Sequence, residues 1–155
     1  MLVSDFFGVP FVPTRNRSLE RILAPITLSK KDVFYDLGSG DGRLPFYMAK
    51  NYGLKAIGVE LNPLLYFYSR LKKRLFKVKN VEFLRANFFD VSLKKASVIY
   101  VFLFPEVVNK LYSKILMECK KGTIIISHGF RIKPLENKKV MTLPQKPFTT
   151  YYYRL

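Results

Sequence analysis

The sequence holds little of the chemistry that small proteins use for cross-links and metal sites. Its 155 residues include one cysteine, Cys119, and one histidine, His128. A single cysteine cannot close a disulfide within the chain, and one cysteine with one histidine cannot provide the four ligands of a common structural zinc site. We therefore expect neither a disulfide scaffold nor a bound metal.

Acidic residues are also scarce. The chain has 11 Asp and Glu residues against 27 Lys and Arg residues, which gives a formal net charge of +16. Such a basic excess fits a nucleic-acid partner, an anionic membrane, an acidic protein partner or plain solvation. Charge governs association and solubility rather than fold, so it does not choose among these.

Long hydrophobic runs are missing as well. The longest apolar run starts at Ala96, continues past Pro105 to Val108 and contains Glu106, so it is too short and too polar to span a bilayer. Residues 1–13 are apolar but lack the basic leader and the cleavage site of a secretory signal. The sequence therefore predicts a cytoplasmic protein without a transmembrane segment.

The composition provides ample material for one hydrophobic core. Hydrophobic residues make up 49% of the chain and aromatic residues 15%, which excludes a disordered protein despite the high charge. The length is that of one ordinary domain, and no repeat, low-complexity tract or linker interrupts the sequence. We predict one domain that covers residues 1–155.

Short apolar runs alternate with longer amphipathic stretches, which is typical of β/α units around a parallel sheet. Strands are predicted at residues 33–37, 55–60, 81–84, 97–103 and 123–127. Helices are predicted at residues 14–23, 43–52, 63–76 and from 105 to the basic residues 120–122. Residues 133–147 contain three prolines and no helical pattern, and residues 140–143 and 149–154 are predicted to form a terminal hairpin.

A glycine-rich loop, from Asp36 to Gly42, follows the first predicted strand and opens a helix. Glycines there allow a tight turn and the close approach of a ligand to the backbone. The spacing of its glycines differs from the dinucleotide pattern, and the carboxylates of Asp36 and Asp41 would repel a pyrophosphate. The loop therefore favours a cationic ligand.

S-adenosylmethionine is such a ligand, because it carries an ammonium and a sulfonium and no phosphate. Glu60 ends the next predicted strand, 24 residues after Asp36, where an acid can accept hydrogen bonds from both ribose hydroxyls. An ordinary βα turn and a solvated acid at a strand end are the alternatives for the loop and for Glu60.

With this loop and this acid, the chain resembles the class I S-adenosylmethionine-dependent methyltransferases. The resemblance implies a Rossmann-like α/β fold with seven strands, a mostly parallel sheet, a C-terminal antiparallel hairpin and helices on both faces. It also implies cofactor-binding residues. Asp36, Gly38, Ser39 and Gly40 would hold the methionine part, Asp41 would add charge, Glu60 would bind the ribose, and Asn87 with Phe88 would contact the adenine. Asn87 has the alternative of a turn-forming role.

Aromatic residues lie at the end of the fourth predicted strand and just after it, next to the segment that lines the acceptor side of these enzymes. Tyr100, Phe102 and Phe104 alternate there with aliphatic residues. An apolar, aromatic channel suits the aliphatic stem of a lysine, and its low polarity favours the neutral amine over the ammonium. We name these three residues as acceptor-channel candidates, with packing in the core as the alternative.

Four segments together carry a narrower resemblance: residues 10–14, 36–43, 58–63 and 101–105. They are similar to a family of protein-lysine methyltransferases that includes the enzymes for the adenine nucleotide translocase and the ATP synthase c-subunit, and compact archaeal relatives. The resemblance implies protein-lysine N-methylation, and that residues 1–31 close over the cofactor with Thr14 near its methionine end. Thr14 is equally suited to cap a helix. His128 is either an acceptor-side residue or a hydrogen-bonded histidine at a strand end.

Two other functions stay open. Basic runs at residues 72–74, 77, 79 and 94–95 suggest an RNA methyltransferase, although charge on a helix surface usually serves solvation. A cofactor-binding interaction subunit without activity is the second alternative. A positive field disfavours a protonated lysine, so we expect an acidic protein as the substrate, with nucleic acid as second choice and peripheral contact with an anionic membrane as a further option.

Overall fold

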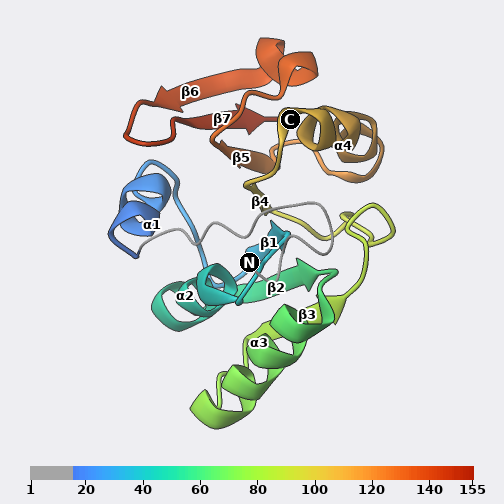
Figure 1. The fold of residues 1–155 in the computed structure, drawn as a ribbon. Helices are drawn as coiled ribbons and strands as arrows, with labels where there is room; N and C mark the ends of the chain where they lie inside the picture. Colours follow the sequence, from blue (N-terminus) through green and yellow to red (C-terminus); the bar gives the residue numbers. More distant parts are fainter. Residues whose placement is uncertain (1–15) are drawn as a thin grey trace.

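Seven strands form one mixed sheet in the computed structural model, which describes residues 16–155. Their spatial order is β3-β2-β1-β4-β5-β7-β6 (Figure 1). The strands are β1 (Val33–Leu37), β2 (Lys55–Glu60), β3 (Val81–Arg85), β4 (Val98–Val101), β5 (Ile124–His128), β6 (Lys139–Leu143) and β7 (Thr150–Arg154). The first five are parallel, and β7 is antiparallel to both β5 and β6. The predicted mostly parallel sheet with a terminal hairpin is confirmed.

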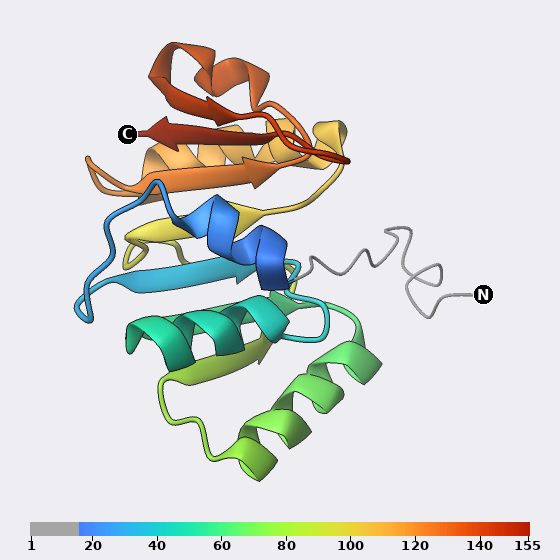
Figure 2. The same ribbon diagram turned by 90° about the vertical axis from the view of Figure 1, so that its left-hand side faces the viewer.

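Helices cover both faces of the sheet, as predicted. They are α1 (Asn16–Leu23), α2 (Arg43–Tyr52), α3 (Pro63–Phe76), α4 (Pro105–Glu118) and the short 3-10 helix η2 (Lys133–Lys138). Figure 2 shows α1, α2 and α3 in front of the sheet and α4 behind it. No helix among residues 16–155 is both long enough and apolar enough to cross a membrane.

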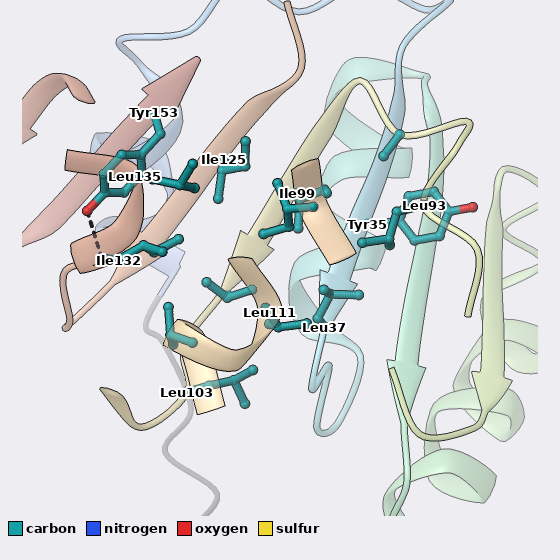
Figure 3. Packing of buried hydrophobic residues seen from close by; sticks show 14 of the residues in the cluster. Tyr35, Leu37, Leu93, Ile99, Leu103, Leu111, Ile125, Ile132, Leu135 and Tyr153 are labelled. Carbon is teal, nitrogen blue, oxygen red and sulfur yellow. Dashed lines mark hydrogen bonds between the residues drawn. The ribbon is translucent and has the colours of Figure 1, made fainter. Parts of the chain in front are cut away.

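Each face of the sheet has its own hydrophobic core. On one face, Leu19 of α1 and Met48 of α2 pack against Phe34. On the other, Leu111 of α4 and Leu135 of η2 pack against the sheet (Figure 3). Neighbouring residues of a strand point to opposite faces. The α1/α2 face therefore receives the even-numbered residues of β1 and β4.

The helix boundaries follow the predicted start and stop signals. The Asn62 side chain accepts hydrogen bonds from the backbone N–H groups of Leu64 (2.9 Å) and Leu65 (3.3 Å), and Pro63 opens α3. Gly53 ends α2 in the left-handed conformation, with φ of 67°. The predicted caps of these two helices are confirmed.

Two features of the fold differ from the sequence prediction. Strand β4 ends at Val101 rather than at residue 103, so Phe102 and Phe104 lie in the loop before α4. Residues 133–138, predicted to lack helical structure, form η2. This helix is only six residues long and has Pro134 in its first turn. Leu135 is its only buried residue. So short a helix with one buried side chain has no hydrophobic periodicity by which the sequence could reveal it.

A buried hydrogen bond ties α1 to the distant strand β7. The hydroxyl of Tyr152 donates to the backbone carbonyl of Ile22 over 2.7 Å. Ile22 lies in the last turn of α1, whose carbonyl groups have no partner within the helix. The tyrosine therefore satisfies one of these groups and fixes the helix on the sheet.

We expect Tyr152→Phe to lower the free energy of unfolding by about 1–3 kcal/mol, because it leaves the Ile22 carbonyl buried without a donor. Chemical denaturation followed by circular dichroism measures this. Tyr112→Phe is the control, since the described residues show no hydrogen bond to the Tyr112 hydroxyl. Equal stability of wild type and Tyr152→Phe would contradict the role assigned to this bond.

Candidate functional site

The glycine loop turns sharply between β1 and α2. The N–H groups of Gly38 and Ser39 both donate to the carbonyl of Val59, over 2.9 and 3.0 Å. Gly38, Gly40 and Gly42 all have positive φ, at 87°, 56° and 75°. Residues with side chains rarely adopt this conformation, so the loop depends on glycine at these positions.

Ser39 places a polar atom in this loop that nothing in the described part of the chain satisfies. Its Oγ is buried and has no hydrogen-bond partner among residues 16–155. The neighbouring strand leaves room for it at Gly58, where a Cβ atom would lie 2.7 Å from Ser39 Oγ. A buried hydroxyl without a partner is costly, so the loop fits a polar ligand such as S-adenosylmethionine.

Glu60 lies at the end of β2 and braces the loop. Its Oε2 accepts from the N–H of Gly40 (2.8 Å) and its Oε1 from the N–H of Asn62 (2.7 Å). Burial raises the pKa of Glu60, although these backbone hydrogen bonds oppose the rise. Each carboxylate oxygen can accept a second hydrogen bond, so the residue keeps acceptors for two ribose hydroxyls.

Asp36 is the most deeply buried acid of the site. Its side chain is 4% exposed, and no donor from the described residues hydrogen-bonds to its carboxyl. Burial, with the negative charges of Glu60 and Asp41, raises the pKa of Asp36 well above its ordinary value. A nearby cation would stabilise the ionised form, which suits the ammonium of S-adenosylmethionine.

Asp41 is engaged differently. Its carboxylate accepts hydrogen bonds from Nε and Nη2 of Arg43, the shortest over 2.8 Å. Burial works to raise the pKa of Asp41, but the hydrogen bonds and charge of Arg43 outweigh it and hold the pKa below its usual value. Much of its charge is therefore compensated inside the protein, and its predicted cofactor contact stays a prediction.

The predicted adenine residues lie in the turn after β3. Asn87 is exposed and its Oδ1 accepts from the N–H of Phe89 over 3.1 Å, which is the turn-forming role considered above. Phe88 is half-buried against the α4-side core. Their contact with adenine stays a prediction. Thr14 lies outside the described residues.

The acceptor candidates separate into a buried group and an open one. Tyr100 is 3% exposed and belongs to the α1/α2-side core, beside Asp36 in the sheet register. Phe104 is 39% exposed, and its ring lies 6.3 Å from that of Phe130. Phe102, which lies between these two residues in the sequence, is half-buried. Of the three, Phe104 is the one open to a macromolecular substrate.

Phe102 also belongs to an aromatic cluster at the carboxyl end of β4 and β5. Its ring lies 4.7 Å from His128 and 5.0 Å from Phe148, and these two rings lie 5.7 Å apart. Gly129 makes this close packing possible, because a Cβ there would lie 2.9 Å from the Phe102 ring. The sequence prediction missed Phe148, which the turn between β6 and β7 brings to this site.

His128 is neutral in this cluster. Burial lowers the pKa of its imidazole to about 4. Its Nδ1 lies 2.8 Å from Oγ1 of Thr150, and that oxygen accepts from the Gln145 amide over 2.9 Å. Either neutral tautomer of His128 can make the Thr150 hydrogen bond, because a hydroxyl both donates and accepts. His128 is thus hydrogen-bonded at a strand end, and its acceptor-side role stays a prediction.

No metal site is found within residues 16–155, where no three His, Cys, Asp or Glu side chains are grouped to hold an ion. The site therefore consists of a glycine loop, the buried Asp36, the half-buried Glu60 and an aromatic edge. The acids and the loop lie at the carboxyl ends of β1 and β2, and the aromatic residues lie at the carboxyl ends of β4 and β5. Ligands of open α/β sheets bind at this edge.

This fold and these acids define the class I S-adenosylmethionine-dependent methyltransferases. Residues 36–139 match the ANTKMT methyltransferase domain, and the chain belongs to this family.

Three relatives illustrate the similarity. The chain is 34% identical over 140 residues to a protein-lysine N-methyltransferase of Saccharolobus islandicus (strain REY15A), covering 86% of this chain and 84% of that protein. It is 30% identical over 123 residues to the ATP synthase c-subunit lysine N-methyltransferase of Mus musculus, covering 79% of this chain and 49% of that protein. The chain thus spans about half the length of the mouse relative.

The third is a solved structure, an RNA methyltransferase from Salinibacter ruber in complex with S-adenosyl-L-homocysteine. It is 30% identical, has a TM-score of 0.86, and the match covers 92% of this chain and 93% of that chain. The bound product supports S-adenosylmethionine as the cofactor of this fold.

We expect cofactor binding to release a proton from Asp36. The raised pKa leaves this carboxyl protonated at a pH where a solvated Asp is ionised, and a bound ammonium favours the ionised form. Affinity should therefore rise with pH up to the pKa of Asp36 in the free protein and then level off. Calorimetry in buffers of different ionisation enthalpy measures the released protons.

Asp36→Asn should remove that proton release and weaken binding by about tenfold or more. The matched control is Glu136→Gln, which changes an acid of η2 outside the site. Unchanged proton release in Asp36→Asn would overturn the assignment of Asp36 to the cofactor.

Proposed function

We propose that this methyltransferase is a protein-lysine N-methyltransferase. The observation that carries the proposal is the aromatic, uncharged acceptor edge, formed by Phe102, Phe104, Phe148 and neutral His128, directly beside the cofactor loop. Gly38 of that loop approaches Leu103, since a Cβ on Gly38 would lie 3.1 Å from Leu103 Cδ2. The names of the Saccharolobus and mouse relatives agree with it.

The acceptor edge suits the chemistry of a lysine amine. A free lysine has a pKa of about 10.4 and no lone pair while protonated. The rings of Phe102 and Phe104 can pack along its aliphatic stem and exclude water, which favours the neutral, nucleophilic amine. Bound S-adenosylmethionine supplies the methyl group as an electrophile.

The chain's own residues orient the two partners. Ser39, Asp36 and Glu60 would hold the cofactor at the ends of β1 and β2, and Phe102 and Phe104 would direct the lysine from the end of β4. Holding both reactants in line lowers the barrier mainly through positioning. Asp41, Asn87, Phe88 and Thr14 remain proposed cofactor contacts, and residues 1–31 a proposed cover of the site within a single domain of residues 1–155.

The expected substrate is a protein with acidic groups around its target lysine, because a chain of net charge +16 repels a basic surface. A cytoplasmic location belongs to the same proposal.

RNA methylation is the second candidate. The similarity to the Salinibacter ruber RNA methyltransferase favours it, as does an open groove between α3 and β3 that Arg70, Lys73, Arg74, Lys77 and Lys79 line. The non-catalytic alternative has less support, because the glycine loop, Asp36 and Glu60 are all in place.

Methyl transfer from labelled cofactor to a mixture of acidic proteins, basic proteins and total RNA separates these functions. We expect label in lysine residues of protein, identified by mass spectrometry, and no label with Glu60→Ala. Label in RNA alone would contradict lysine methylation and establish the second candidate. No label in any fraction, with cofactor bound, would favour the non-catalytic alternative.

Phe104→Ala should reduce turnover by about tenfold or more while cofactor affinity stays within about twofold, because this ring is expected to position the acceptor and not the cofactor. Met117→Ala, which removes a 78% exposed side chain of α4, is the control. Steady-state kinetics with calorimetry measures both quantities. Equal losses of turnover and affinity would make Phe104 a packing residue.

A further inference from the structure

Helix α3 exposes its apolar side. Of its 14 residues only Ser69 is buried. Four large apolar side chains follow one another at helical spacing and are more than half exposed: Leu64 (63%), Phe67 (57%), Leu71 (55%) and Leu75 (66%). They form one stripe along the helix, which we call the α3 stripe. A helix on a protein surface normally turns such a stripe toward the core.

Packing against the cofactor loop explains why the α3 stripe faces outward. The hydroxyl of Ser69 donates to the carbonyl of Leu65 (3.0 Å) and approaches that of Gly40 (3.4 Å). Gly42 packs against the same side, where a Cβ would lie 2.8 Å from Ser69 Oγ. Only a small side chain fits between α3 and this loop, so the large apolar residues point outward.

The α3 stripe is flanked by positive charge. Arg70 and Arg74 lie along one side of it and Lys72 along the other, and the helix contains no acidic residue. Lys72 lies over the rings of Phe46 and Tyr68, each 5.2 Å from its Nζ, and donates to the Asp41 carbonyl over 3.3 Å, so the open charges of this helix face are those of Arg70 and Arg74. Apolar residues with basic flanks are the pattern of a helix that lies in a membrane interface.

The position of α3 in the molecule permits such a contact. Figures 1 and 2 show α3 at the β3 edge of the sheet, with no other described element over its outer side. None of the four stripe residues lines the groove between α3 and β3. A fluid, flat partner can therefore surround it.

We propose that the α3 stripe inserts into the headgroup layer of an anionic lipid bilayer, with the exposed Arg70 and Arg74 side chains on the lipid phosphates. Charge selects this occupant. A second copy of the chain would place two sets of like charges against each other, at a net charge of +16 per chain. An RNA strand would find one ring in the stripe, Phe67, on which a base could stack, whereas Leu64, Leu71 and Leu75 offer only aliphatic surface, which a lipid layer can bury.

Membrane binding through α3 would bring the cofactor site at the end of β2 close to the lipid. The stripe begins at Leu64, and the preceding Asn62 donates its N–H to Glu60 over 2.7 Å. The start of α3 is thus fixed to the cofactor site. That the acceptor lysine then lies in a protein at the membrane surface rests on the proposed function, whereas lipid binding does not.

Vesicle co-sedimentation of the full chain tests the proposal. We expect binding to vesicles containing phosphatidylglycerol, little binding to pure phosphatidylcholine, and a loss of binding at about 0.5 M NaCl, where exposed charges are screened. Leu71→Gln with Leu75→Gln should reduce binding tenfold or more, and so should Arg70→Gln with Arg74→Gln. Leu116→Gln with Met117→Gln changes exposed apolar residues of α4 and should bind as wild type.

Cofactor affinity of every variant serves as the folding check, and no methyl acceptor is needed, so failure of lysine methylation leaves this test intact. Equal, weak binding of wild type to both kinds of vesicle would overturn the proposal. A dimer in sedimentation equilibrium that dissociates when Leu71→Gln is combined with Leu75→Gln would also overturn it. An RNA mobility shift that is lost only when Arg70→Gln is combined with Arg74→Gln would do the same.

Discussion

The close packing of the glycine loop against β2 and α3 is the constraint on which the rest of the site depends. Gly58 leaves the space that Ser39 fills, and Gly42 leaves the space that Ser69 fills. Because these contacts leave no room for larger side chains, the loop can stand against the sheet with the N–H groups of Gly38 and Ser39 bonded to Val59 and the buried Ser39 hydroxyl open to a ligand. Glu60 closes the arrangement through its bond to Gly40.

The same packing explains two features that otherwise look unrelated. It holds the buried acid Asp36 close to the negative charge of Glu60, where a cationic cofactor would stabilise the ionised Asp36. It also forces the apolar side of α3 outward, since only Ser69 fits against the loop. The cofactor site and the exposed α3 stripe are thus consequences of one steric requirement.

The acceptor side depends on a different part of the chain. The turn between β6 and β7 brings Phe148 onto Phe102, and β7 brings Thr150 onto His128. In sequence these residues stand more than 20 positions apart from their partners, and the loop around Phe148 has no periodicity that marks it. Insertion of β7 between β5 and β6 creates this neighbourhood.

The sequence by itself determined the alternation of strands and helices, the caps at Asn62 and Gly53, the glycine loop and Glu60, because each depends on the conformational preferences of nearby residues. Only the tertiary structure decided the burial of the Ser39 hydroxyl without a partner among residues 16–155, the aromatic cluster around His128 and the outward side of α3. Those features depend on burial and on contacts between distant segments, and local sequence carries no signal for either.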